Sequence, residues 1–550
     1  MNTPKKPFRS FLRTLLCGGG LLFLIQPTLD AGSATWSANP ISSDWNNAAN
    51  WRPRTVPNGP DDRATFAVSD TTNVSITGEQ TEVDGIVFLR SASAFTITAD
   101  APTNSTILTL SGLGLANNSG VTQNIVVSNF GYSGELNFTN QARARGQISF
   151  TVEGAANDIA FYDFANAGSG TYLIEGTSFF EDGHPNLYFF DSSNAGTGIF
   201  TNTGGSGPES EGGATVFSGF ASARLGTFVN TAATDPAAYS GGTTTFTENS
   251  RAEQATITCD GADVADAVGG VVEFAGTSDA VLATLIANSG SNGGNGGLIR
   301  FSESADGGLA RVELFGNGTL DLGDSFNGAT IGSLEGDGIV LLGPERLTIG
   351  TYSYSLSTEF SGVIQGSGSL TKAGSGTLTL SGANTYTGAT TVTGGFLRVE
   401  NRTGSATGSG TVFIQTGATL GGGGILTSIV TISGGTLAPG TGATTLNLKT
   451  KLLYSSGTYL WTVRTTSVKA DKVIAKGVQL FNASFSGSAV GSATLPSGTV
   501  FTAIDNTSSA PITGTFGNLA DGGTITVGNN TYQASYEGGD GNDLTLTVVP

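Results

Sequence analysis

The sequence is poor in the side chains from which most active sites are built. Its 550 residues include one histidine, two cysteines and one methionine. Charged residues make up only 12% of the chain, and Lys and Arg together number 24. These shortages exclude a highly charged disordered chain, a coiled coil and an ordinary helix-rich enzyme, because the solvent-facing sides of helices need Lys and Glu.

The scarcity of histidine and cysteine also limits the chemistry. Cys17 lies in the apolar stretch near the N-terminus, so Cys259 is the one cysteine expected in a mature chain, and no intramolecular disulfide is expected. One Cys and one His cannot build a His/Cys zinc site. His184 lies in a turn-like segment, 181–185, and we interpret it as an exposed loop residue rather than a catalytic base.

What the chain does contain points to strands and turns. Glycine (83 residues), Thr and Ser are abundant, hydrophobic residues reach 38%, and Phe (31) far outnumbers Tyr (12). No segment of useful length shows a 3.6-residue hydrophobic period. The composition therefore predicts an all-β protein with many short connections.

The charge balance limits the partners. The formal net charge is −19, and no block of like charge is present. A Lys-poor, acidic surface disfavours nucleic acid and anionic lipid, because phosphate binding relies on Lys and Arg. We interpret the acidity as a solvated surface that keeps the protein soluble.

Residues 1–34 have the three parts of a signal peptide. A basic segment (4–13) precedes a short apolar segment (14–25), and small residues follow at 31–34. Twelve apolar residues are fewer than the roughly 20 that span a bilayer as a helix. We expect cleavage after Ala34, or else after Ala31, a secreted or cell-surface location, and no integral membrane segment in the mature chain.

The middle of the chain repeats about every 28 residues. The repeat is anchored by six phenylalanines, and an apolar residue follows each of them eleven positions later. The anchors are Phe161, Phe189, Phe217, Phe246, Phe274 and Phe301, and the followers are Tyr172, Phe200, Phe228, Ile257, Leu285 and Val312. A fixed period of this size indicates a solenoid, a propeller or an array.

The unit is too short for a propeller blade, which needs four strands, and it lacks the helix of other common repeats. Two short strands and turns suit a coil of a parallel β-helix. Stacked coils would place each anchor Phe above the last at the ~4.8 Å strand spacing. The predicted fold is thus an all-β parallel β-helix (solenoid) over 71–345, with an N-terminal cap and a C-terminal β-rich segment.

Three of the four tryptophans lie close together near the N-terminus, as Trp36, Trp45 and Trp51. A solenoid must cover its first coil, because open strand edges invite aggregation. We interpret residues 35–70 as a Trp-rich N-terminal cap. Sugar stacking by exposed tryptophans is the alternative.

A specific motif occupies residues 361–399, SGVIQGSGSLTKAGSGTLTLSGANTYTGATTVTGGFLRV. It closely resembles the autotransporter-associated β-strand repeat, with matching positions that include Leu370, Lys372, Asn384 and Tyr386. The resemblance implies a β-helical, exported passenger-like protein. It places the repeat region at 346–445, followed by a C-terminal β segment, 446–550, that ends in a hairpin. The C-terminal membrane barrel of true autotransporters is not expected here, since only 150 residues follow position 400.

Three acidic segments are candidate binding or catalytic sites. Gly538–Asp543 resembles one calcium-binding nonapeptide, but its apolar position is shifted and no second copy exists, so we interpret it as a hairpin turn. Asp163 and Asp191 share one repeat position, with no Arg or Lys at a neighbouring one, and we interpret them as turn residues rather than a catalytic pair. Asp260–Asp266 is interpreted as a surface loop.

The sequence therefore predicts no catalytic, cofactor-binding or metal-binding residues and no cofactor. We expect an exported, non-enzymatic β-solenoid that serves as an extracellular scaffold or adhesin-like surface protein, with extracellular polysaccharide or envelope components as candidate partners. The alternative is a carbohydrate-binding or polysaccharide-degrading β-helix protein.

Overall fold

The computed structural model describes residues 32–100, 104–128, 132–179, 183–351 and 355–550. These residues form 48 β-strands and one 3-10 turn, η1 (Ala48–Asn50). In this part of the chain no helix has the length and apolar character needed to cross a membrane. The predicted all-β class is confirmed. All but three residues of the expected signal peptide lie outside the described ranges.

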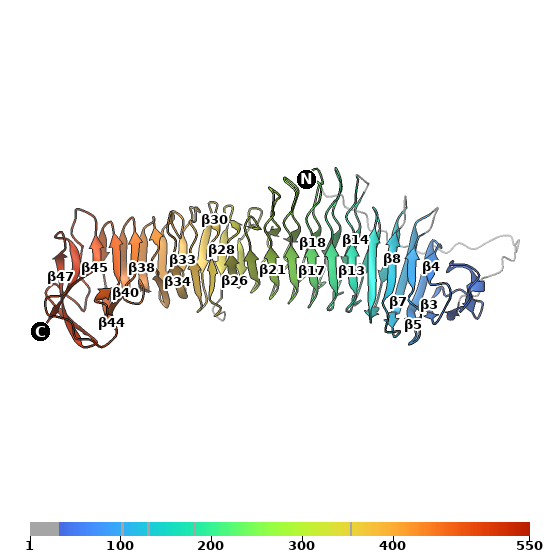
Figure 1. The fold of residues 1–550 in the computed structure, drawn as a ribbon, viewed down its shortest axis with the longest axis horizontal. Coiled ribbons are helices and arrows are strands. Elements are labelled where there is room, and N and C mark those ends of the chain that lie inside the picture. The colour runs from blue at the N-terminus through green and yellow to red at the C-terminus, as the bar shows by residue number, and fades with distance from the viewer. Residues whose placement is uncertain (1–31, 101–103, 129–131, 180–182, 352–354) are drawn as a thin grey trace, which may run out of the picture.

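The chain winds as a parallel β-solenoid of about 17 turns. Figure 1 shows the strands stacked side by side along one long axis, from the blue N-terminal cap to the red C-terminal end. Most coils give one strand to each of two long sheets, and the pairings within these sheets are parallel except at a few ends, as between β1 and β2. The predicted parallel β-helix is therefore confirmed.

Three sheets account for all the strands. The first sheet contains β1 (Ala34–Trp36), β2 (Trp51–Arg52), β3 (Gly59–Phe66), β5 (Gln80–Phe88), β7 (Thr106–Asn117), β9 (Gly134–Phe138), β10 (Arg143–Arg145), β12 (Asp158–Phe161), β14 (Asn186–Phe189), β16 (Ala214–Phe217), β18 (Thr243–Phe246), β20 (Val271–Phe274), β22 (Leu298–Phe301), β24 (Thr319–Asp321), β27 (Ile339–Leu341) and β30 (Val363–Gln365). The second contains β4 (Asn73–Ile76), β6 (Thr96–Ala99), β8 (Gln123–Ser128), β11 (Ile148–Glu153), β13 (Thr171–Ile174), β15 (Ile199–Asn202), β17 (Thr227–Asn230), β19 (Thr256–Cys259), β21 (Thr284–Ala287), β23 (Arg311–Leu314), β25 (Ala329–Ile331), β26 (Ser333–Gly336), β28 (Arg346–Ile349), β29 (Thr358–Phe360), β31 (Ser369–Lys372), β32 (Thr377–Leu380), β33 (Thr390–Val392), β34 (Gly395–Val399), β35 (Val412–Gln415), β36 (Ala418–Gly421), β38 (Val430–Leu437), β40 (Leu452–Arg464), β41 (Lys469–Ala470), β43 (Val478–Leu480) and β44 (Ala483–Val490). The third contains β37 (Ile425–Leu426), β39 (Thr445–Leu448), β42 (Lys472–Ala475), β45 (Val500–Asn506), β46 (Thr524–Val527), β47 (Asn530–Gly538) and β48 (Asp543–Val549).

The anchor phenylalanines form the predicted interior ladder. Phe189 pairs in register with Phe161 on one side and Phe217 on the other, and its ring centroid lies 4.9 Å and 4.6 Å from theirs. The stack begins one coil earlier than expected, at Phe138, which lies 4.4 Å from Phe161. All of these rings are buried. Parallel pairing in register thus converts a sequence period into a continuous aromatic column.

A second column faces the first across the core. Phe150, Tyr172, Phe200 and Phe228 stack at 4.4–4.8 Å, and the aliphatic followers continue the same register. The two columns meet edge to face, as between Phe189 and Phe200 at 6.0 Å. This edge-to-face contact is a favoured geometry for aromatic pairs.

The three N-terminal tryptophans are buried together rather than exposed. Trp36, Trp45 and Trp51 have ring centroids 4.8–5.0 Å apart in successive pairs, and Phe66 packs beneath them. Their indole N–H groups donate to backbone carbonyls, as from Trp51 to the carbonyl of Trp45. Burial excludes these three rings as the exposed sugar-stacking surface considered above.

Candidate functional site

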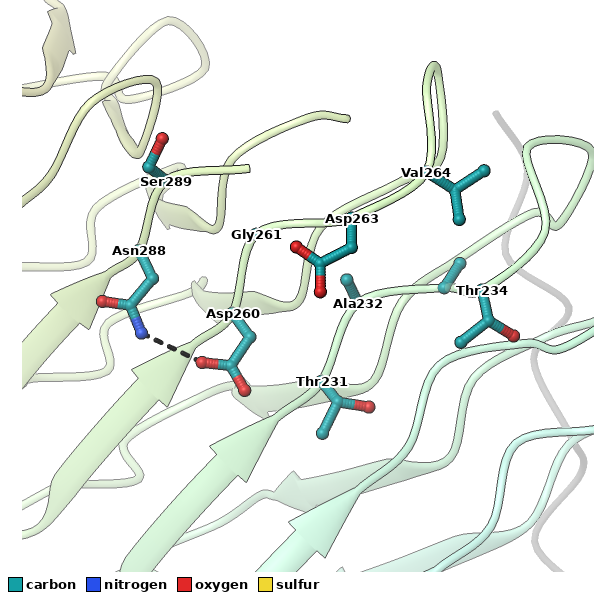
Figure 2. A pocket seen from close by; sticks show the side chains of 10 residues that line it. Thr231, Ala232, Thr234, Asp260, Gly261, Asp263, Val264, Asn288 and Ser289 are labelled. Carbon is teal, nitrogen blue, oxygen red and sulfur yellow. Dashed lines mark hydrogen bonds between the residues drawn. The ribbon is translucent and has the colours of Figure 1, made fainter. Parts of the chain in front are cut away.

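The hollow in Figure 2 lies where three neighbouring strands of the second sheet end. It has a volume of about 430 Å³ and is lined by residues from the loops after β17, β19 and β21. Asp260, which follows β19, accepts a hydrogen bond from Nδ2 of Asn288 at 2.9 Å. Asp263, further along the same loop, accepts one from Oγ of Ser291 at 2.6 Å. The hollow thus presents two carboxylates whose partners are neutral.

This hollow offers little for catalysis. No Arg, Lys or His lines it. Nowhere in the described ranges do three or more His, Cys, Asp or Glu side chains come together as a candidate metal site. Asp260 is half-buried, whereas Asp263 and Asp266 are exposed, as the surface-loop interpretation predicts. What the hollow can do is accept hydrogen bonds from a ligand's hydroxyl or amide groups.

Asp163 and Asp191 occupy a corner of the coil with left-handed backbone, at φ +54° and +55°. Oδ2 of Asp163 accepts from the backbone N–H of Asn140 at 2.8 Å, and Oδ2 of Asp191 accepts from that of Asp163 at 3.1 Å. Each carboxylate therefore holds the preceding coil. The interpretation of both as turn residues is confirmed.

The same corner carries a carboxylate in more coils than the two recognised from the sequence. Glu248 and Glu303 take this position two and four coils beyond Asp191, with φ near +55°. Their Oε2 atoms accept from the backbone N–H groups of Gly219 and Gly276 at 2.8 Å. An Asp-only pattern does not include these residues, yet the longer Glu side chain reaches the same N–H group one coil back.

His184 is a partly exposed loop residue. Its Nδ1 lies 2.8 Å from Oε2 of Glu211, and both side chains are about 40% exposed. No hydroxyl or thiol nucleophile contacts its ring among the described residues. An imidazole paired only with a surface carboxylate has no group to activate.

Cys259 is a buried, free cysteine. Burial raises the pKa of its thiol to about 12, and Nδ2 of Asn230 lies 3.8 Å from the sulfur. A nucleophilic cysteine needs the thiolate form near neutral pH. Cys259 therefore acts as a core residue.

The calcium-like segment forms a hairpin. β47 and β48 pair antiparallel, with Gly538 opposite Asp543 at the turn. Oδ1 of Asp543 accepts from the backbone N–H of Asn506 at 2.8 Å, so this carboxylate ties the hairpin to β45. Burial raises the pKa of Asp543 above its ordinary value. The predicted hairpin is confirmed.

Three polar residues of the 361–399 motif, Asn384, Tyr386 and Thr390, are buried in the core. Asn384 accepts from the backbone N–H of Ile364 at 2.7 Å and donates to the carbonyl of Ala406 at 2.6 Å, which links three successive coils. The hydroxyl groups of Tyr386 and Thr390 lie 2.6 Å apart inside the core. These motif positions therefore serve stacking rather than ligand contact.

Lys372 is the unusual member of the motif. Lys372 is only 4% exposed. Its Nζ donates to the carbonyls of Ala373, Gly374 and Gly394, and the last two lie at 3.1 and 3.4 Å. Burial lowers the pKa of this lysine to about 8. Among the described residues it forms no ion pair, so backbone carbonyls alone receive its ammonium group.

Comparison with known proteins agrees with this geometry. Residues 370–399 match the family model described as the passenger-associated-transport-repeat. A search of curated proteins finds no match to the chain. The matched segment covers β31–β34, two successive coils of the solenoid. The chain thus carries a passenger-associated transport repeat within a β-solenoid, as expected of an autotransporter passenger-like repeat protein.

Proposed function

We propose that the protein is exported and works outside the cell as a non-enzymatic scaffold or adhesin-like surface protein. The observation that carries this proposal is the passenger-associated repeat at 370–399, which continues without a break into the parallel solenoid on both sides. Repeats of this family belong to transported passenger proteins, which supports a secreted or surface location.

The shape supports a scaffold. About 17 turns at the ~4.8 Å strand spacing give a rod roughly 80 Å long. Each coil contacts mainly its neighbours, so the rod presents long, regular side surfaces on which partners can dock. The acidic surface favours solubility of such an extended molecule.

The side chains support a non-enzymatic role. Glycan hydrolysis needs two carboxylates in different environments that face one groove. The repeated corner carboxylates instead accept backbone N–H groups of the preceding coil, as Asp163 and Glu248 do. This structural role accounts for the corner carboxylates without any catalytic function.

Cell fractionation tests the proposal. The gene is expressed with a tag joined to the C-terminus after Pro550, and intact cells are treated with protease. We expect the protein in the medium or digested on the cell surface, with a mature start near Thr35. Protein retained inside the cell with residues 1–13 still attached contradicts export.

The enzymatic alternative is tested on purified protein. We expect acidic and neutral polysaccharides to remain uncut after prolonged incubation. Release of reducing ends or unsaturated sugars, abolished by Asp163→Ala or Asp191→Ala, supports a polysaccharide-degrading protein instead.

A further inference from the structure

A groove of about 430 Å³ crosses five consecutive coils on the arc that joins the two long sheets. Its lining includes Arg143, Asn194 and Arg224 from the first, third and fourth of these coils, and Gln254 from the fifth. Five coils at the ~4.8 Å spacing give a length of about 19 Å. The groove therefore runs parallel to the solenoid axis and suits an extended polymer.

Two cations, Arg143 and Arg224, face this groove. Arg143 and Arg224 are exposed, and neither side chain has an ion pair or hydrogen bond with any residue that the structure describes. Four other arginines of the described ranges, Arg63, Arg300, Arg311 and Arg398, pair with carboxylates, as Arg311 does with Glu335 at 2.8 Å. In a chain of net charge −19 with only 24 basic residues, this hollow has two guanidinium groups against one carboxylate, that of Glu253, in its lining.

Amide groups line the groove between the arginines. Nδ2 of Asn166 donates to Oδ1 of Asn194 at 2.6 Å, while Oδ1 of Asn166 accepts from the backbone N–H of Gly168. This chain of bonds fixes the Asn194 amide with its Nδ2 group available as a donor. Gln254 adds an exposed amide. Such a lining matches a ligand that carries both negative charge and many hydroxyl groups.

We propose that this groove binds an acidic polysaccharide, a chain rich in uronic acids. Its carboxylates pair with Arg143 and Arg224, since guanidinium binds carboxylate through two parallel hydrogen bonds. Its hydroxyl groups bond to Asn194 and Gln254. The inference depends on the proposed extracellular role in one respect, which is that the protein meets this polysaccharide outside the cell.

Duplex nucleic acid fits the groove less well. It carries one negative charge per ~1.7 Å of axis, and binding it depends on many basic side chains. A uronic acid chain is less densely charged, so two arginines suffice to attract it. The screening length is ~8 Å, so more distant acidic side chains oppose this binding only weakly. Glu253 also lines the groove and opposes an anion there.

The backbone conformation at Arg224 allows a substitution that removes the guanidinium group without straining the fold. Arg224 has φ +53°, and the equivalent position in other coils is Gly168, Gly196 and Gly308, also left-handed. Arg224→Gly therefore removes the guanidinium and relieves backbone strain at once. Val281, with φ +56°, holds the same position two coils further on and does not line the groove, so Val281→Gly is its matched control.

The experiment titrates purified full-length protein with oligogalacturonate in a calorimeter at low salt and at physiological salt. We expect binding that weakens with salt and a loss of about tenfold or more in affinity for Arg224→Gly. Arg143→Gln should weaken binding similarly, Val281→Gly should leave it unchanged, and Glu253→Gln should strengthen it. Thermal melting of each variant checks that the solenoid is intact.

Three results overturn the inference: no binding by the wild type, equal binding by Arg224→Gly, or tighter binding of duplex DNA than of oligogalacturonate. A neutral dextran that binds as well as oligogalacturonate also overturns it, since the arginines would then have no role. Failure here leaves the fractionation result untouched, and binding by a protein that stays inside the cell contradicts only the extracellular role.

Discussion

The coils around the phenylalanine columns and the coils around the transport repeat differ in length and in the side chains that fill their core. In the first region, paired strands are 28 residues apart, as between Phe189 and Phe217, and the core is aromatic. In the second, the steps fall to 17–23 residues, as between Leu370 and Thr390, and the core is chiefly Leu, Ile and Val. The additional residues of the long coils lie in loops and on corner arcs.

The long coils carry the larger surface hollows, whereas the short coils are closely packed. Both hollows of about 430 Å³ lie along the long coils, whereas the hollow beside Lys372 in the short coils holds only about 10 Å³. The transport repeat uses its polar residues to join coils internally, as Asn384 does. We therefore expect ligand contact in the first region and mainly structural duties in the second.

The largest expected effect is the loss of a ring from the aromatic column. Phe189→Ala should lower the free energy of unfolding by about 3–5 kcal/mol, through lost transfer energy and a cavity. Phe189→Leu keeps the bulk and should cost only about 1 kcal/mol, the contribution of ring stacking. Amide hydrogen exchange in the flanking coils measures both, since a long repeat array need not unfold in two states. Equal protection in wild type and Phe189→Ala contradicts a buried column.

Removing the amide that joins three short coils should have the next largest effect. Asn384→Ala leaves the N–H of Ile364 and the carbonyl of Ala406 buried without partners, at about 1–3 kcal/mol each. Asn384→Asp retains an acceptor for Ile364, but it buries an unpaired carboxylate against the carbonyl of Ala406, so at neutral pH it should destabilise at least as much as Asn384→Ala. Chemical denaturation followed by circular dichroism ranks the three proteins. If all three unfold together, the internal amide does not hold the short coils.

Stability should depend on pH through Lys372. Its folded pKa of about 8 lies below the ~10.4 of an unfolded lysine, so the unfolded state binds more protons between these values. The cost of burying the charged form is present in full below pH 8 and is relieved as pH rises towards 10. Wild type should therefore gain about 1–3 kcal/mol relative to Lys372→Met between pH 7 and 10. Parallel pH profiles for the two proteins contradict a charged, buried Lys372 at neutral pH.

The smallest effect concerns a strained corner of the long coils. Val281 is β-branched and has φ +56°, where glycine stands in three equivalent coils. Val281→Gly should raise the stability by about 0.5–1 kcal/mol, as relief of strain exceeds the added freedom of the unfolded chain. Leu282→Gly, one residue on and without the left-handed backbone, should instead destabilise. A lower melting temperature for Val281→Gly contradicts the strain.

Much of the long-coil core could be predicted because parallel pairing in register preserves sequence spacing in space. The step of 28 between Phe161, Phe189 and Phe217 needs only that rule to become a column. Phe138 lies outside this 28-residue spacing because the loop before Phe161 is shorter, which places the two rings 23 residues apart. The transport repeat was evident from its motif, since Gly, Asn and Leu at fixed places leave few other packings.

The arginine groove could not be predicted from spacing. Arg143 and Arg224 belong to different repeat positions in coils three apart, and only the register of the intervening strands brings them to one hollow. Nor does the sequence mark which corners are left-handed, since Arg224, Glu253 and Val281 replace glycine there. Side chains that converge across several coils become visible only when the winding is known.

The placement of the tryptophans makes the molecule its own optical probe. Trp36, Trp45 and Trp51 lie in the first coils and Trp461 in β40 near the other end, so tryptophan fluorescence reports on the two ends and not on the middle. With Trp461→Phe, emission comes from the N-terminal cap alone. If the rod frays from its ends, fluorescence will change at lower denaturant than circular dichroism, and the variant will tell which end opens first.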